Sequence, residues 1–176
     1  ASLDKVFAAI DAANARDPGR DPATGEPAAL LYGRRMSECL ARFLPDADEA
    51  LAIAVRGQHI ERWIVPRANY PMDRVGYLGW RNELKDHHAN RLAEIMADAG
   101  YGEAAIARVR SVVRKERLRT DPQAQALEDV ACLVFLEFHA ADFAAKHDEA
   151  KVVDIVRKTW SKMSEHGHAA AGRLAL

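Results

Sequence analysis

The sequence has few of the features that mark secreted, membrane or zinc-ribbon proteins. It contains two cysteines in 176 residues, Cys39 and Cys132. Each lies within an apolar helical pattern, so they predict neither a disulfide framework nor a zinc ribbon. The sequence also lacks an apolar run of the roughly 18 to 20 residues that a membrane span needs, and it lacks a basic-then-apolar leader. These absences predict a cytoplasmic protein without a membrane partner.

An excess of charge of one sign is also missing. The 25 basic and 26 acidic side chains give a net charge of −1, and 29% of the residues are charged. Balanced charge gives no broad attraction to the phosphates of nucleic acid, so no nucleic-acid partner is expected. With 49% apolar residues, the composition is typical of a soluble globular protein, and the length suits one domain over residues 1–176.

Several catalytic signatures are absent as well. There is no glycine-rich loop between a strand and a helix to hold phosphates, and no nucleophile elbow, HExxH sequence or paired-cysteine motif. Ser111 and Ser161 lie in the middle of helical patterns without a nearby base in the sequence. The sequence therefore supports neither nucleophilic catalysis nor an organic cofactor.

Helical periodicity is what the chain does have, over almost its whole length. Apolar residues recur at helical spacing, capping residues precede these segments, and proline or glycine follows several of them, whereas strand alternation and internal repeats are missing. We expect an all-α fold of about seven helices. The expected helices span residues 2–16, 28–44, 46–63, 77–100, 102–118, 124–147 and 149–163, with Ser164 capping a short terminal helix that begins at Glu165.

Two acidic residues stand out in the sixth expected helix. This helix is apolar on nearly every side from Leu127 to Leu136, as is typical of a central helix, yet it carries Glu128 and Asp129. A carboxylate buried without a partner costs several kcal/mol or becomes protonated. A metal ion, a basic side chain from another helix or a helix N-terminus can compensate the charge. The remaining alternative is that one acid reaches solvent near the start of the helix.

Histidines on two other helices are candidates to meet these acids. His88 shares a helix face with Leu84 and Leu92, so it is expected to point inward, whereas His87 is expected to point outward. His59 lies on an apolar face near the end of the third expected helix. Cations that border these histidines or occur in later helices are candidates to bind an anionic substrate: Arg56, Arg62, Arg81, Lys85 and Lys115.

Taken together, His59, His88 and Asp129 form a candidate metal site. Two neutral imidazoles and a carboxylate suit a divalent first-row metal such as Mn, Fe, Co, Ni or Zn, with open positions for water or substrate. In that hypothesis Glu128 and Asp129 are the candidate catalytic acids, and a metal-bound water attacks a phosphoester. The alternative is a buried hydrogen-bond network of histidine and carboxylate that only fixes helix packing.

The order of "ALAIAVRGQHIERW", "HANRLAEIMADAGY", "IARVRSVVRKE" and "ALEDVACLVFLE" resembles the HD-domain superfamily of metal-dependent phosphohydrolases over about residues 28–146. The resemblance implies an HD-like helical bundle, with C-terminal helices over residues 149–172 packing on it. His88 and Asp129 match the later ligand positions of that family, and Gln58 and His59 stand where its His-Asp pair would be. Two positions depart from the pattern, because Tyr32 stands at the first histidine and Gln58 at the histidine of the His-Asp pair.

A more specific resemblance covers nearly the whole chain. The segments "LYGRRM", "QHIERW", "YPMDRVGYLGWR", "LEDVACLVFLE", "FAAKHDEAK" and "RKTWSKMS" resemble a family known as domain of unknown function 4202, which implies no activity. Two hypotheses follow. The first is metal-dependent hydrolysis of a small phosphoester such as a nucleotide, which the buried acids favour. The second is an HD-like module without turnover that binds an anionic small molecule or a protein partner, which Tyr32 and Gln58 favour.

Overall fold

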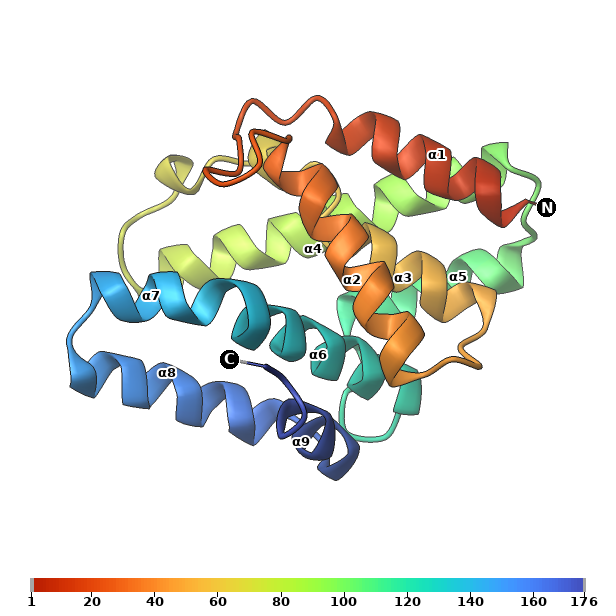
Figure 1. Cartoon of the computed structure of the whole chain (residues 1–176). Coiled ribbons are helices and arrows are strands. Elements are labelled where there is room, and N and C mark those ends of the chain that lie inside the picture. The colour runs from red at the N-terminus through yellow and green to blue at the C-terminus, as the bar shows by residue number, and fades with distance from the viewer. Residues whose placement is uncertain (1, 176) are drawn as a thin grey trace.

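The computed structural model describes residues 2–175, and helices account for most of them (Figure 1). Across these residues no strand is formed, apart from one isolated bridge between Arg20 and Pro27, so the predicted all-helical fold is confirmed. The nine α-helices are α1 (Leu3–Asn14), α2 (Ala28–Phe43), α3 (Glu49–Gly57), α4 (Arg74–Asp98), α5 (Glu103–Arg114), α6 (Pro122–Val134), α7 (Ala140–Lys146), α8 (Glu149–Lys162) and α9 (Glu165–Ala171). Three short turns complete them, namely η1 (Arg62–Ile64), η2 (Arg67–Asn69) and the π-helical turn η3 (Phe135–His139).

Capping side chains explain where most of the helices begin. A side-chain oxygen of the residue before the helix accepts a hydrogen bond from a free backbone N–H of its first turn. Ser164 caps α9 in this way by accepting from Gly167 N at 3.1 Å, so the short helix predicted from Glu165 is confirmed. The other capping residues are Ser2, Asp48, Asp73, Asp121 and Asp148.

The described residues form nine α-helices instead of the seven or so expected, because the short terminal helix α9 adds to that number and the sixth predicted segment is divided in two. Two of the predicted segments, the third and the sixth, are interrupted. The third ends at Gly57, and the chain then turns through Glu61, whose φ of 56° lies in the left-handed region. A tertiary contact fixes that turn, since Glu61 N donates to Asn14 Oδ1 at 3.0 Å. The sixth is divided by the π-helical turn η3 into α6 and α7. Neither interruption has a local sequence signal.

Helix α6 is central, as its apolar sequence predicts. Leu127 and Val130 are fully buried, and the helix contacts α2, α3, α5, α8 and α9. Its side chains join one hydrophobic core that reaches from α1 to Met163 at the end of α8. Figure 1 shows α1 on one side of this core, with α8 and α9 on the other. Loss of apolar surface from water at these contacts is the main force that holds the helices together.

The helices after α6 cover one side of the core. In Figure 1, α7 and α8 run side by side in opposite directions, and α9 turns back toward α6. Thr159 is the buried residue of α8, and much of the remaining helix surface is exposed. Among residues 2–175, no helix combines the length and the apolar character required to cross a bilayer.

Candidate functional site

Two adjoining hollows form a cleft beside α6. The large compartment has a volume of about 550 Å³ and lies between α2, α6, η3 and α8. The small compartment has a volume of about 220 Å³ and lies between the end of α3, α4 and α5. Five residues line both compartments and join them: Gln58, His59, Arg62, Arg81 and Lys115. The cleft therefore collects side chains from segments that are far apart in the sequence.

His88 is held in the wall of the small compartment in its neutral form. Its side chain is buried on α4, as the helical spacing predicts, and its Nδ1–H donates to the carbonyl oxygen of Ile60 at 2.7 Å. The pKa of this imidazole is lowered from 6.5 to about 4, mainly by burial; the Ile60 hydrogen bond opposes this shift, and the nearby charges of His87 and Arg62 add to it. At neutral pH the bond to Ile60 thus leaves Nε2 as the unprotonated acceptor.

His59 lies between the two compartments. Its ring stacks on Tyr32 with the centroids 4.9 Å apart, and its centroid is 5.8 Å from that of His88. Burial holds its pKa well below 6.5, and the positive charge of Arg62 adds to the effect. Within residues 2–175 its ring nitrogens have no hydrogen-bond partner, and the residue lines both compartments. The imidazole is therefore neutral and available to a ligand.

Tyr32 and Gln58, which depart from the HD-domain pattern, contact each other directly. The Tyr32 hydroxyl donates to Gln58 Oε1 at 3.1 Å. Burial raises the pKa of the tyrosine, so it remains a neutral phenol at neutral pH. The two substituted positions thus form a hydrogen bond across the cleft wall, where the resemblance would place metal ligands.

Positive charge without compensation is the main electrostatic feature of the cleft. Its lining includes five cations, Arg62, Arg81, Lys85, Lys115 and Lys162, and two acids, Asp17 and Glu128. Across the part of the chain that the structure describes, Arg62, Arg81 and Lys85 form no ion pair with a carboxylate. Burial lowers the pKa of Lys85, as do the positive charges of Arg81 and Lys115.

Glu128 lies in the large compartment and is neutralised by a lysine. Lys115 Nζ lies 2.6 Å from Glu128 Oε2, and both side chains are nearly nine-tenths buried. Lys115 follows α5 directly and has a left-handed φ of 53°, so α5 ends here before the predicted residue 118. Of the ways to compensate this buried acid, the protein uses a basic side chain from the neighbouring segment.

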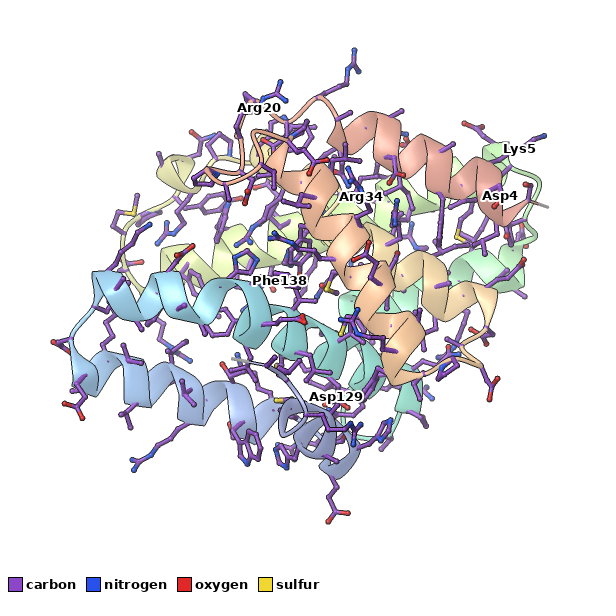
Figure 2. The ribbon with its side chains drawn as sticks, in the orientation of Figure 1. Asp4, Lys5, Arg20, Arg34, Asp129 and Phe138 are labelled. Atoms are coloured by element: carbon purple, nitrogen blue, oxygen red, sulfur yellow. The ribbon has the colours of Figure 1, made fainter. Side chains whose placement is uncertain are left out.

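Asp129 does not join the two histidines, which corrects the predicted convergence. It lies on α6, on the side of α9 (Figure 2), and lines neither compartment. It accepts hydrogen bonds from Ser164 N at 2.8 Å, from Ser164 Oγ and from Gln125 Nε2 at 3.1 Å. Among residues 2–175, no three histidine, cysteine, aspartate or glutamate side chains are grouped to hold a metal ion. The reason is geometric, because Asp129 points about 100° away from Glu128 around α6. The start of α9 therefore compensates its charge.

Arg56 also lies outside the cleft, although it was expected to bind substrate. Its guanidinium donates to both carboxylate oxygens of Asp11, at 2.9 and 2.6 Å, and lies over the ring of Phe7. The end of α3 at Gly57 separates the two arginines of this segment. Arg56 joins α3 to α1, whereas Arg62 lines the cleft.

The sequence did not identify the residues that close the large compartment. They come from η3 and from one face of α8, and they are Phe135, His139, Ile155, Thr159 and Lys162. A π-helical turn adds a residue to a helical turn and rotates the following side chains, and such turns are frequent at functional sites. No sequence pattern marks η3. The amphipathic spacing of α8 was the available signal, since its apolar face had to cover some part of α6.

Comparison with known proteins assigns the chain to a family. A family described as Domain of unknown function (DUF4202) matches residues 4–176. The chain belongs to this family. Neither a curated protein nor a solved structure matches the chain. All the residues of the cleft, from Asp17 to Lys162, lie within the DUF4202 match. The description names no activity, so the chemistry of the cleft itself is the basis for a function.

Proposed function

We propose that the cleft binds a small anionic molecule, with the charged group of the ligand in the small compartment. The observation that carries this proposal is the group formed by Arg62, Arg81 and Lys85, which are cations without an acidic partner among residues 2–175. Like charges held together repel each other, and a bound anion removes that repulsion. The planar guanidinium groups are suited to bidentate binding of phosphate or carboxylate oxygens.

The two imidazoles complete this arrangement as neutral hydrogen-bonding groups. His88 accepts through Nε2, and His59 offers either ring nitrogen to the ligand, depending on its tautomer. Inorganic phosphate keeps at least one protonated oxygen near neutral pH, and a monoester keeps one below a pH of about 6, so these ligands can use an acceptor as well as cations. The small compartment provides both kinds of partner.

Calorimetric titration with inorganic phosphate tests this proposal. Arg62→Ala and Lys85→Ala should each weaken phosphate binding about tenfold, since a hydrogen bond to a charged group contributes about 1.5–3 kcal/mol. The matched control is Arg74→Ala, because Arg74 is an exposed arginine at the start of α4 that does not line the cleft. Absence of phosphate binding by the parent protein, or an equal loss in the control, contradicts the proposal.

Glu128→Gln provides a test of opposite sign. Replacement of this acid removes a negative charge beside Lys115 and leaves the shape of the compartment nearly unchanged. Phosphate affinity should therefore rise several-fold. If Glu128 acts as a catalytic acid or binds a metal that recruits the anion, the same variant loses turnover or affinity instead.

Metal-dependent hydrolysis of a phosphoester is the second candidate function, and the neighbouring rings of His59 and His88 favour it. The hydrogen bond from His88 Nδ1 to Ile60 is of the kind that orients metal-binding histidines. Two nitrogens fall short of the three protein ligands usual in catalytic zinc sites, however, so the donor set does not fit such a centre. Elemental analysis of untagged protein and of His59→Ala tests this candidate. Equal metal content in the two proteins contradicts it.

Two further predictions accompany these functions. The HD-like arrangement of the helices stays a prediction from resemblance, and so does the hydrolase activity that it implies. The cytoplasm stays the expected location, and the free, buried thiols of Cys39 and Cys132 are compatible with reducing conditions.

A further inference from the structure

We propose that the ligand is amphipathic, with an anionic head in the small compartment and a hydrocarbon body in the large compartment. This inference rests on the proposed anion binding and names the class of ligand. The class includes alkyl or prenyl phosphates and fatty carboxylates of moderate length, which share an anionic head and a hydrocarbon body. The two compartments adjoin and share His59, Arg62 and Lys115, so one molecule can extend from one into the other.

Most of the surface that faces the large compartment is apolar, although charged and polar residues also line it. Alanines from α2 and α6, together with Phe135 of η3 and Ile155 of α8, surround a volume of about 550 Å³. This volume lies within the range of about 300–1,000 Å³ that is usual for pockets that bind small molecules. An apolar surface around a space of this size favours a ligand that removes it from water.

His59, Arg62 and Arg81 lie where the large compartment meets the small one, and the buried polar groups farther inside the large compartment already have partners within the protein. Asp17 accepts from Gly19 N at 2.8 Å and from Ala29 N at 2.9 Å. Thr159 Oγ1 donates to the carbonyl oxygen of Ile155 at 2.8 Å. Tyr32 donates to Gln58, and Lys115 is paired with Glu128, as described above. The interior of this compartment therefore offers few free donors or acceptors to a ligand.

Because few hydrogen-bonding groups are free in the large compartment, it favours a hydrocarbon body over a sugar or a nucleobase. Each polar group of a sugar or base that enters the compartment would lose its water without gaining a protein partner, which is unfavourable. Away from the junction with the small compartment, His139 and Lys162 are polar lining residues without such a bond, but both are exposed, so they can meet only the solvent end of a ligand. A hydrocarbon chain has no polar groups to satisfy.

Titration with a homologous series of alkyl phosphates tests the inference. Butyl, hexyl and octyl phosphate should bind successively more tightly than inorganic phosphate, by roughly fourfold for each methylene that becomes buried. Octanoate should likewise bind more tightly than acetate. A gain in affinity with both head groups would show that the hydrocarbon body is its cause. Adenosine monophosphate should bind more weakly than octyl phosphate.

The possible outcomes separate the inference from the function on which it rests. If inorganic phosphate binds but affinity stays flat along the alkyl series, anion binding stands and the amphipathic ligand is overturned. If adenosine monophosphate binds more tightly than octyl phosphate, the inference is overturned in the same way. If neither phosphate nor any alkyl phosphate binds, the proposed function itself fails.

A variant that fills the large compartment gives an independent test. Ala131→Leu adds three carbon atoms to the wall of α6 that lines this compartment. It should weaken binding of octyl phosphate at least tenfold more than it weakens binding of inorganic phosphate. Ala141→Leu is the matched control, because Ala141 is exposed on α7 and lines neither compartment. Equal losses for the two ligands overturn the inference.

If Ala131→Leu does not fold, as judged by circular dichroism, Ala28→Leu replaces it. Ala28 lines the same compartment but lies at the exposed start of α2, where a larger side chain causes little overpacking. The same tenfold difference between octyl phosphate and inorganic phosphate is expected. A variant that binds both ligands as the parent does overturns the inference.

Discussion

The two sides of helix α6 use neighbouring acids in opposite ways. On the side of α9, Asp129 accepts hydrogen bonds from Ser164 and Gln125, and it lines neither compartment. On the side of the cleft, Glu128 neutralises Lys115, and three other cations of the small compartment have no acidic partner among residues 2–175. The contact of Asp129 fixes helix packing, whereas the cations of the cleft lack negative charge that a bound ligand can supply.

Two arginines in the C-terminal half of the third expected helix, Arg56 and Arg62, repeat this difference. Arg56 forms a two-point contact with Asp11 and is mostly buried. Arg62 lines the cleft, lies over Trp80 and has no carboxylate partner within residues 2–175. A charge with a complete set of partners contributes to stability, whereas a charge without one contributes to binding. Each prediction below tests one side of this division.

The largest expected effect follows removal of the acid that binds α9. Asp129→Ala should lower the free energy of unfolding by about 4 kcal/mol, because two donors of Ser164 lose a charged acceptor in a buried place. Urea unfolding followed by circular dichroism measures this loss. Phosphate affinity should stay within about twofold of the parent value. A loss of stability below about 1 kcal/mol would show that this contact does not fix α9.

Gly167→Ala is a second variant for the same contact. A Cβ atom at Gly167 would lie 2.6 Å from Asp129 Oδ1, so the first turn of α9 has to shift away from α6. The expected cost is about 2 kcal/mol, in the range usual for overpacking. The two variants should not add fully, because both disturb one contact.

Acid should weaken the folded state through His88 on the side of the cleft. The pKa of this imidazole is lowered to about 4 in the folded protein and is 6.5 when unfolded, so its full contribution is present above pH 6.5. As the pH falls from 6.5 toward 4, the unfolded chain takes up a proton that the folded protein does not. Stability should then fall by about 3 kcal/mol at 1.36 kcal/mol per pKa unit.

Urea unfolding at several pH values between 7 and 4 measures this effect. His59 acts in the same direction, because burial also lowers its pKa. His88→Gln removes one titrating group and should flatten the profile, whereas replacement of the exposed His139 by Gln should change it less. An unchanged slope in His88→Gln would contradict the prediction.

The fold could largely be predicted from the sequence, because its signals are local. Apolar spacing identified the helical segments and the central position of α6, and Ser164 marked the start of α9. The end of α3 could not be predicted, because the turn at Glu61 depends on a hydrogen bond that Glu61 N donates to Asn14, 47 positions away. The π-helical turn η3 has no local signal either, so α6 and α7 were predicted as one helix.

The candidate site, like the fold, could be predicted from the sequence only where the signal lies within one helix. Helical spacing brought Arg81, Lys85 and His88 onto one side of α4, and all three line the small compartment. The partners of Asp129 and Arg56 could not be predicted, because they lie 35 and 45 residues away in the sequence. A pattern along one helix shows which side chains share a face. It does not show which other segment packs against that face.

The smallest expected effect on stability provides the most direct test of the comparison between the two arginines. Arg56→Ala should cost about 2 kcal/mol, because it leaves Asp11 without its partner and exposes the ring of Phe7. Arg62→Ala should cost less than about 0.5 kcal/mol, since no ion pair is lost. For phosphate binding the order should reverse, with about a tenfold loss in Arg62→Ala and none in Arg56→Ala. Equal effects of the two variants on both measurements would mean that partnered and unpartnered charges do not have separate roles in this protein.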